Sequence, residues 1–250
     1  MDSRGGRRVA CAWALAVCTV GVAPSSAALA QPSAEQPTPV AVLHAAIDRL
    51  GDLDYARRSA AARTVRRTPG DLAVPALLKA AAEHADGYVR FRALVLMTGF
   101  NDPRVDGAMK EALVSPNDRL RTVAYGYVER YPDPALVPML LAALDKEQAE
   151  FVRPAVVRAL AAHGADSRVQ PVLVRDIGRG EDLFRSAVIE ALGEHRATYA
   201  IDALTSTAGL DGPLQDDAVL ALGRIGDARA LQTLASLQSS APRDRQSSIA

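Results

Sequence analysis

The sequence predicts an all-α protein in which pairs of helices stack in single file as a solenoid, and an internal repeat is the main evidence. A phrase of about 31 residues recurs along the chain, and each copy holds an apolar stretch, a polar break and a second apolar stretch. The copies begin at Asp71, Asp102, Asp133, Asp166, Arg196 and Asp227, in steps of 31, 31, 33, 30 and 31 residues. Such regular spacing favours stacked helix pairs over a single central core.

The second copy shows how one repeat is expected to fold. Asp102 is a good N-cap, and Pro103 suits the first turn of a helix because its missing N–H would have no partner there. Apolar residues follow at helical spacing over 105–113, residues 115–117 break the pattern, and 120–131 resume it. The pattern predicts two antiparallel helices per repeat. We expect structural roles for the Asp residues that open four of the copies: Asp102, Asp133, Asp166 and Asp227.

The end of the last full copy carries a family resemblance. Residues 221–227 read Ala-Leu-Gly-Arg-Ile-Gly-Asp, and most second helices open with an apolar residue followed by Arg. These features resemble the HEAT-type repeat, particularly the bacterial HEAT_2 and phycobilisome-lyase-like variety, from Val40 to the C-terminus. The resemblance implies a right-handed superhelix of HEAT/ARM-like repeats whose second helices line a concave surface used for binding proteins. We expect about six helix pairs in 40–250 and a partial last repeat. Its first helix is expected over 227–237, and Pro242 begins a second helix that stops at Ala250.

Residues 1–30 have the organisation of a secretory signal peptide. Three Arg residues precede an uncharged apolar run over 9–23, and small residues at 28 and 30 mark a cleavage site after Ala30. The run is shorter than the about 20 residues that a membrane-spanning helix needs, which favours a removed signal over an anchor. We therefore expect export to the periplasm or secretion. Residues 31–39, rich in Pro, Gln and Ser, are predicted to form a flexible linker.

Both cysteines of the chain, Cys11 and Cys18, lie within this leader. The exported protein should therefore have neither a disulfide nor thiol chemistry, even in an oxidising compartment. Lipidation of Cys18 is disfavoured because Val17 is β-branched where a lipoprotein cleavage box needs a small residue. Stability must come from packing.

Composition excludes one class of partner. The chain has 29 basic and 29 acidic residues, and the leader holds three Arg and one Asp, which leaves 26 against 28 and a formal charge of −2. This balance argues against nucleic acid as the partner. No later segment is apolar enough to span a membrane once the signal is removed.

One Arg recurs at the start of the second helix in four copies, and two roles are open for it. The residues are Arg90, Arg121, Arg153 and Arg185. In the first interpretation they form an internal ladder, each bonding carbonyls or Asp side chains at the repeat turns. In the second they form a basic track for an acidic ligand. The first is favoured, and mutation of one Arg separates them, because it should impair folding in the first case and binding in the second.

The histidines and the motifs of common enzymes give no catalytic centre. His163 and His195 occupy equivalent positions in successive copies, about 10 Å apart, which is too far to share one metal. The deoxyhypusine hydroxylases, which are helical-repeat enzymes, bind two irons through recurring His-Glu pairs. In this chain Glu83-His84 and Glu194-His195 have the reverse order and stand on non-neighbouring copies. We predict no catalytic residues, metal ligands or cofactors.

The helical periodicity predicts a set of exposed residues on the concave face: Phe91, Val95, Thr122, Tyr127, Arg158, Glu190, Asp217 and Leu220.

Charge is uneven along the chain. Five Arg crowd the first repeat over 57–67, whereas Asp and Glu gather over 181–217. Most such runs are solvated faces, but opposite ends also favour head-to-tail self-association.

The sequence thus predicts a non-catalytic scaffold for protein–protein interaction, exported to the cell envelope. The main alternative is an enzyme or enzyme-accessory module, lyase-like or metal-dependent, that uses the concave groove. A third possibility is a structural element of the cell envelope. The partner is expected to be a protein, and its identity does not follow from the residues.

Overall fold

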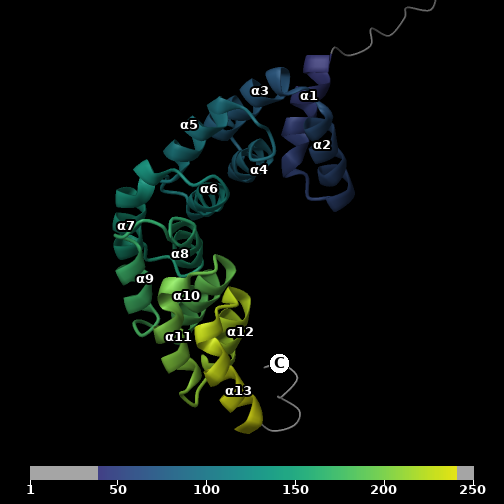
Figure 1. Ribbon diagram of the computed structural model, residues 1–250. Coiled ribbons are helices and arrows are strands. Elements are labelled where there is room, and N and C mark those ends of the chain that lie inside the picture. Colours follow the sequence, from purple (N-terminus) through teal and green to yellow (C-terminus); the bar gives the residue numbers. More distant parts are fainter. Residues whose placement is uncertain (1–38, 241–250) are drawn as a thin grey trace, which may run out of the picture. The chain divides into compact units, whose positions relative to one another are not determined.

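Within residues 39–240, which the computed structural model describes, every regular element is a helix (Figure 1). The first helices of six successive pairs are α1 (Pro39–Asp48), α3 (Gly70–Glu83), α5 (Pro103–Ala112), α7 (Val137–Lys146), α9 (Gln170–Asp176) and α11 (Ile201–Ala208). Their partners are α2 (Tyr55–Arg67), α4 (Gly87–Met97), α6 (Asp118–Arg130), α8 (Arg153–Ala161), α10 (Asp182–Glu194) and α12 (Gln215–Ile225). After the sixth pair comes α13 (Leu231–Ser240). The predicted all-α solenoid is confirmed.

Short 3-10 turns lead into several of the first helices. Pro134–Leu136 precedes α7, Thr198–Ala200 precedes α11 and Ala228–Ala230 precedes α13. A fourth turn, Arg49–Gly51, follows α1. The first three turns tighten the connections between repeats and the fourth lies inside the first pair. A 3-10 turn has this effect because it has fewer residues per turn than an α-helix.

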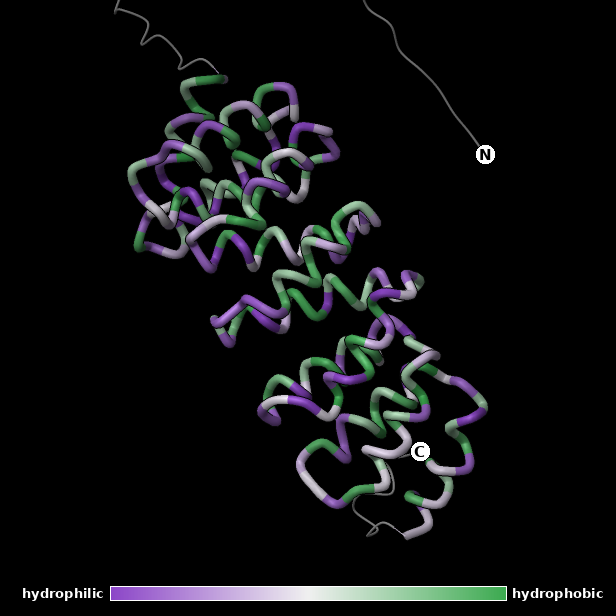
Figure 2. Tube along the Cα trace, turned by 90° about the vertical axis from the view of Figure 1, so that its left-hand side faces the viewer, coloured by the Kyte–Doolittle hydropathy of each residue, from purple (hydrophilic) through white to green (hydrophobic). Residues whose placement is uncertain are grey.

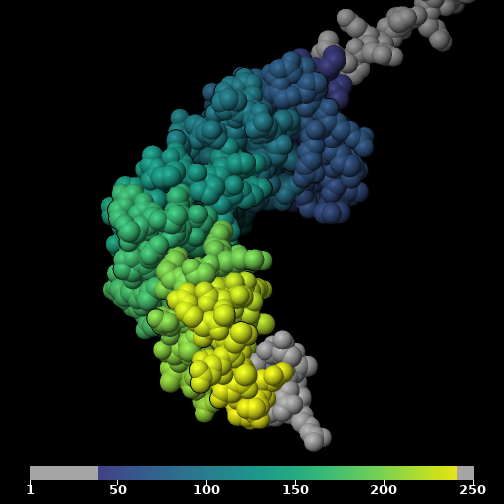
Figure 3. All heavy atoms as spheres, viewed as in Figure 1, coloured from purple at the N-terminus to yellow at the C-terminus, as the bar shows by residue number. Residues whose placement is uncertain are grey.

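The helix pairs stack in chain order. Each second helix packs against its own first helix and against the second helices before and after it, so that α4, α6, α8, α10 and α12 form one continuous row. In Figure 1 and in the space-filling view of Figure 3, this row lines the hollowed side of the repeats. We call the side of the row that faces away from the first helices the inner face.

The hydrophobic core is drawn out along the repeats. One connected cluster of buried apolar side chains runs from Leu43 in α1 to Ala230 before α13. Figure 2 shows the hydrophobic segments spread over the whole length of the helix stack and not gathered at one centre. Each repeat therefore buries its apolar faces against its neighbours, as the regular period predicts.

The Asp residues at the repeat openings cap the first helices. Asp102, Asp133 and Asp227 each accept a hydrogen bond from the backbone N–H two residues later, and Asp166 does the same in the turn before α9. Three of them also pair with an Arg at that position, Arg104, Arg168 or Arg229. These hydrogen bonds lower the pKa of Asp102 and of Asp166 to about 2.

Two copies depart from this capping pattern. In the first, Asp71 lies inside the first turn of α3, and Pro69 takes the cap position without a side-chain hydrogen bond. In the fifth, Ala197 precedes the 3-10 turn and likewise gives no side-chain cap. The preceding residue, Arg196, adopts a φ of +50°. Gly226 has the equivalent position at the end of α12 with a φ of +69°, which glycine adopts without strain.

The backbones of α10 and α12 approach each other closely. A Cβ added to Gly193 would lie 2.8 Å from the Cα of Ala221, so only glycine permits this approach. Gly223 follows Leu222 just as Gly193 follows Leu192, yet a Cβ there would meet nothing within 4 Å. The Ala-Leu-Gly phrase therefore has a packing role in α10 that it lacks in α12.

Several predictions fall outside the described residues. They are the signal peptide over 1–30 with its cleavage after Ala30, the lipidation question at Cys18, the linker predicted over 31–38, and the helix expected from Pro242. Pro39, which we expected to be the last linker residue, is the first residue of α1. Between residues 39 and 240, no helix combines the length and the hydropathy needed to cross a membrane.

Candidate interaction surfaces

The recurring Arg residues mostly hold the turn within their own repeat. The guanidinium of Arg90 donates to the His84 carbonyl at 2.5 Å, that of Arg121 to the Ser115 carbonyl at 2.8 Å, and that of Arg185 to the Ile177 carbonyl at 2.9 Å. In each case the carbonyl belongs to the turn that joins the two helices of the pair. These contacts satisfy carbonyl groups that a helix end leaves without partners.

Sequence reasoning missed two members of this ladder. Arg58 donates to the Asp52 carbonyl at 2.6 Å, and Gln215 donates to the Ala208 carbonyl at 3.1 Å. Arg58 lies in the weakly repetitive first pair, within a run of Arg that conceals its position. Gln215 keeps the hydrogen bond without the charge, which shows that the contact depends on the N–H donor and not on a positive charge.

Arg121 also ties one repeat to the next. Its guanidinium makes two hydrogen bonds to the Glu147 carboxylate, at 2.9 and 3.0 Å, and one to Asp118 at 2.6 Å. The Glu147 side chain is only 7% exposed. Burial opposes its ionisation, but the hydrogen bonds from Arg121 and from the backbone N–H of Ala149 outweigh burial and lower the pKa of Glu147. The same pairing raises the pKa of Arg121.

Arg153 departs from the predicted ladder. Its guanidinium lies over the ring of Phe184, with 3.9 Å between Cζ and the ring centroid, and its buried Nε has no hydrogen-bond partner among the described residues. The next repeat places an aromatic ring, that of Phe184 in α10, against this guanidinium. A cation–π contact therefore replaces the carbonyl contact.

The residues proposed for the inner face share helical positions. Val95, Arg158, Glu190 and Leu220 each follow the ladder position by five residues, on α4, α8, α10 and α12. Glu190 and Leu220 are exposed, whereas Val95 and Arg158 are half-buried. The position thus holds an aliphatic, a cationic, an anionic and a second aliphatic side chain. Phe91 and Thr122, both half-buried, follow the ladder Arg directly, and the Thr122 hydroxyl donates to the Asp118 carbonyl at 3.0 Å.

Two residues of the predicted set contact neighbouring helices. Tyr127 points toward the first helix of its own pair, where its hydroxyl contacts Asp106 and its ring lies 4.7 Å from that of Tyr131. Burial, and then the contact with Asp106, raise the pKa of Tyr127 to about 12. Tyr127 follows the inner-face position of α6, Gly126, by one residue, and one residue turns a helix by about 100°. Asp217 faces α10 and accepts a hydrogen bond from Ser186 at 2.6 Å.

A cluster of three charged or titratable groups joins three successive repeats. Glu129 of α6 lies 3.6 Å from the Nε of Arg158 in α8 and 3.3 Å from the Nε2 of His195 at the end of α10. All three side chains are about one-quarter to one-third exposed, at 23%, 35% and 24%. Sequence reasoning missed Glu129 because its partners lie 29 and 66 residues further along the chain.

The other histidines have structural surroundings. His163 is buried and its ring nitrogens contact the Ala159 and Asp133 carbonyls at 2.7 and 3.1 Å. His84 lies 3.4 Å from Asp48, beside a cleft of about 260 Å³ that His44 also lines. Within 39–240, no three Cys, His, Asp or Glu side chains come together in a way that could hold a metal ion.

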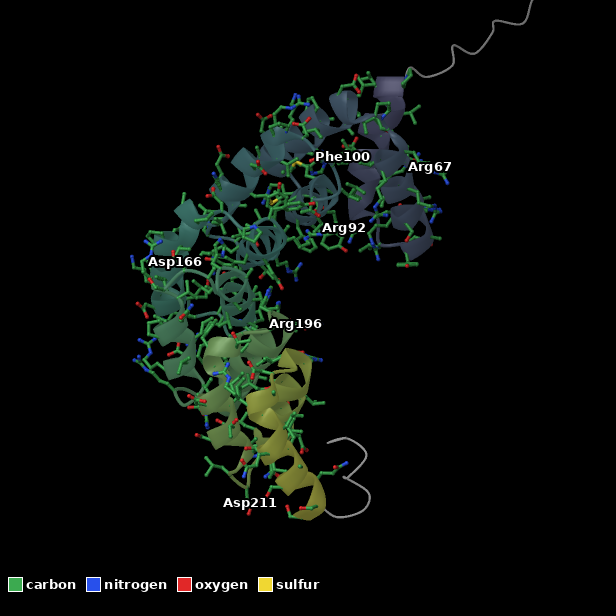
Figure 4. All side chains as sticks on the ribbon, in the orientation of Figure 1. Arg67, Arg92, Phe100, Asp166, Arg196 and Asp211 are labelled. Atoms are coloured by element: carbon green, nitrogen blue, oxygen red, sulfur yellow. The ribbon has the colours of Figure 1, made fainter. Side chains whose placement is uncertain are left out.

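Cationic side chains are exposed in the first repeat and also occur further along the repeats. The Arg residues of α2 that are exposed are Arg57, Arg63, Arg66 and Arg67. Figure 4 places Arg92 and Arg196 on the hollowed side of the repeats and Asp166 on the opposite side. Cations on the hollowed side are therefore not confined to the first repeat.

The fold and the contacts define a class of protein, an all-α solenoid of repeated helix pairs. Residues 74–161 match the HEAT repeats family model, and residues 214–240 match the PBS lyase HEAT-like repeat. These two segments of the chain thus match HEAT-type repeats, as the sequence pattern indicated. No curated protein sequence matches it.

One solved structure has the same fold. The crystal structure of YibA from Escherichia coli is 18% identical in sequence, with a TM-score of 0.57, and the match covers 83% of this chain and 80% of that chain. Human deoxyhypusine hydroxylase in complex with glycerol is 19% identical over 83% of this chain and 81% of that chain, with a TM-score of 0.39. At these identities the likeness to YibA shows the fold alone, and the weaker likeness to the hydroxylase carries no argument.

Proposed function

We propose that this chain is a non-catalytic scaffold that binds a partner protein along the inner face of its repeats. One observation carries the proposal. The framework groups recur from repeat to repeat, whereas the inner-face position changes along the row, which reads Val95, Gly126, Arg158, Glu190 and Leu220. A regular frame that presents a varied row of side chains suits recognition of one extended partner, because each repeat contributes a different contact.

Capture from a cell-envelope extract tests this proposal. The full chain should retain a defined partner that is lost when Val95→Ser, Arg158→Ala and Glu190→Ser are combined. The matched control carries Met139→Ser, an exposed apolar residue on α7 in the row of first helices, and should retain the partner. Equal capture by the inner-face variant and the wild type would rule out the inner face as the binding surface.

Export and cleavage belong to the same proposal. The Arg residues, the apolar run and the small residues of the leader support secretion with cleavage after Ala30. N-terminal sequencing of the protein from fractionated cells should give Gln31 as the first residue. An intact Met1 on the protein recovered from the cytoplasmic fraction would contradict export.

The competing function, an enzyme or accessory module that uses the same groove, has a different signature. A lyase-like or metal-dependent protein should be purified with a chromophore or a metal. Absorption spectra and metal analysis of the purified chain separate the two functions, because a scaffold should be colourless and free of stoichiometric metal.

Self-association is a secondary proposal. It is supported by the exposed Arg residues of α2 and by the carboxylates of the later repeats. Head-to-tail contacts of this kind should be weakened by salt, because exposed charges are screened beyond about 8 Å at physiological ionic strength. Light scattering that shows a monomer at low salt and at high protein concentration would contradict it.

A further inference from the structure

Exposed apolar side chains gather at one edge of the helix stack. Among residues 39–240, seven large apolar residues are at least 60% exposed, and six of them lie where the first helix of a pair turns into the second: Leu53, Tyr55, Val114, Phe151, Leu183 and Leu210. Single exposed apolar residues are normal when they are scattered. A row of them on equivalent turns of five of the six pairs is not scattered, because helix stacking aligns these turns along one edge.

The last three pairs add a carboxylate to each apolar residue. Glu150 precedes Phe151, Glu181 lies two residues before Leu183, and Asp211 follows Leu210. All three carboxylates are exposed. None of them forms an ion pair with any residue from 39 to 240. We call Phe151, Leu183, Leu210, Glu150, Glu181 and Asp211 the turn edge.

The charge of the turn edge selects the chemistry of its partner. Three segments join the two helices of the last three pairs: 147–152, 177–181 and 209–214. They contain one cation, Arg179, and the three carboxylates that form no ion pair within 39–240. The one further carboxylate, Glu147, is neutralised by Arg121. A basic partner is therefore attracted and an acidic one repelled. Anionic lipid headgroups are also repelled, so the apolar row does not suit a membrane surface.

The repeat spacing selects the conformation of the partner. Packed helices are about 8–10 Å apart, so successive apolar residues of the turn edge recur at about that distance. A polyproline II helix advances about 9.3 Å per turn of three residues and returns every third side chain to the same face. In a β-strand, successive side chains point to opposite faces, so the residue three positions further along points away from the face of the first. A polyproline II segment therefore matches the spacing.

We propose that the turn edge binds a basic segment of a partner protein in polyproline II conformation, with an apolar residue at every third position and a Lys or Arg beside it. This second surface is separate from the inner face. Apolar side chains of the segment contact Phe151, Leu183 and Leu210, and its cations pair with Glu150, Glu181 and Asp211.

A labelled peptide of repeated Leu-Pro-Lys triplets tests the proposal by fluorescence anisotropy with the full chain. We expect a Kd below about 1 mM. Leu183→Ser or Glu181→Lys should each weaken binding about tenfold, a loss typical of central interface residues. The matched controls Met139→Ser and Glu111→Lys alter an exposed apolar residue and an exposed carboxylate on α7 and α5, and should leave binding unchanged.

Peptide variants separate spacing from charge. A peptide of Leu-Pro-Glu triplets keeps the spacing and should not bind, and one with Leu at every fourth position should bind more weakly. No binding of the Leu-Pro-Lys peptide at about 1 mM, or equal binding by a Phe151→Ser, Leu183→Ser, Leu210→Ser variant, would overturn the proposal. So would binding of the chain to anionic lipid vesicles that the triple variant abolishes, because that result assigns the edge to a membrane.

The inner-face variant distinguishes this proposal from the proposed function. The chain with Val95→Ser, Arg158→Ala and Glu190→Ser should bind the triplet peptide like the wild type. Loss of peptide binding in that variant, with retention in the turn-edge variant, would place the peptide on the inner face and overturn the turn edge alone.

Discussion

We call the packing interface between two successive second helices a joint. The joint between α6 and α8 and the joint between α10 and α12 are held by different interactions. At the first joint, Arg121 reaches the buried Glu147 of the next repeat through two hydrogen bonds. At the second, Gly193 lets the backbones of the two helices approach until no Cβ would fit. The repeat period is nearly the same at both. A regular repeat period therefore predicts that the helices stack, whereas individual side chains determine which interactions stabilise each joint.

The largest effect should come from breaking the polar joint. Arg121→Met leaves the Glu147 carboxylate buried without its main partner, which should lower the free energy of unfolding by about 3 kcal/mol. Chemical denaturation measures the change. The double variant with Glu147→Gln should recover a large part of it, since the uncompensated charge is then absent. A loss below about 0.5 kcal/mol for Arg121→Met would mean that the joint does not depend on this pair.

Breaking the packed joint should cost somewhat less. Gly193→Ala places a Cβ 2.8 Å from the Cα of Ala221 and must separate α10 from α12, which should cost about 1–3 kcal/mol. Gly223→Ala is the matched control, because it has open space and gains helix propensity of about 1 kcal/mol. Thermal unfolding of both variants should give shifts of opposite sign. Shifts of the same sign would contradict the packing role of Gly193.

Acid should weaken the polar joint selectively. The folded-state pKa of Glu147 is below its ordinary value of 4.5, so its stabilising contribution is present above pH 4.5 and is lost as the pH falls through the folded-state value. Wild type should therefore be more stable than Glu147→Gln near neutral pH, and the difference should shrink as the pH falls below about 4.5. Unfolding curves over this range give that difference directly. A difference independent of pH would show that the carboxylate charge is not involved.

Arg153 should be far less important than Arg121. Its Nε is buried without a hydrogen bond, and its main contact is the Phe184 ring. Replacement by Met removes a cation–π contact but also an unsatisfied polar group, so the net change should be below about 1 kcal/mol. The same denaturation experiment as for Arg121→Met makes the comparison. Equal losses for the two variants would indicate that Arg153 has a polar partner after all.

The smallest effect should be stabilising. Arg196 has a φ of +50° just after α10, where α12 has Gly226. Arg196→Gly removes the cost of a left-handed residue, about 1 kcal/mol, although the unfolded chain gains freedom that offsets part of this. The reverse change, Gly226→Arg, should destabilise. A melting temperature that falls for Arg196→Gly would mean that the Arg side chain makes contacts worth more than the strain.

Much of the frame was predictable, because it follows from local rules. Asp102 and Asp133 indicate where the first helices of their repeats begin, because capping needs only the backbone N–H two residues further along. The carbonyl contacts of Arg90 and Arg121 are likewise made within their own repeats. Repetition makes such contacts visible in a single sequence, because each copy shows the same signal again.

The surfaces were predictable only in part. Helix phase placed Arg158, Glu190 and Leu220 at one shared position, but it misplaced Tyr127 by a single residue, which turned its side chain to another neighbour. Arg153 could not be separated from its equivalents, since its environment depends on Phe184 in the next repeat. A one-residue error matters on a helix because each residue rotates the side-chain direction by about 100°.

The sequence by itself determined that this chain folds as stacked helix pairs with capped turns, because those interactions join residues within one repeat. Only the tertiary structure decided that Glu129 meets both Arg158 and His195, that Gly193 lies against Ala221 with no room for a Cβ, and that exposed apolar residues align on one edge. These features depend on how neighbouring repeats are rotated and spaced, and that geometry arises from packing summed over many side chains.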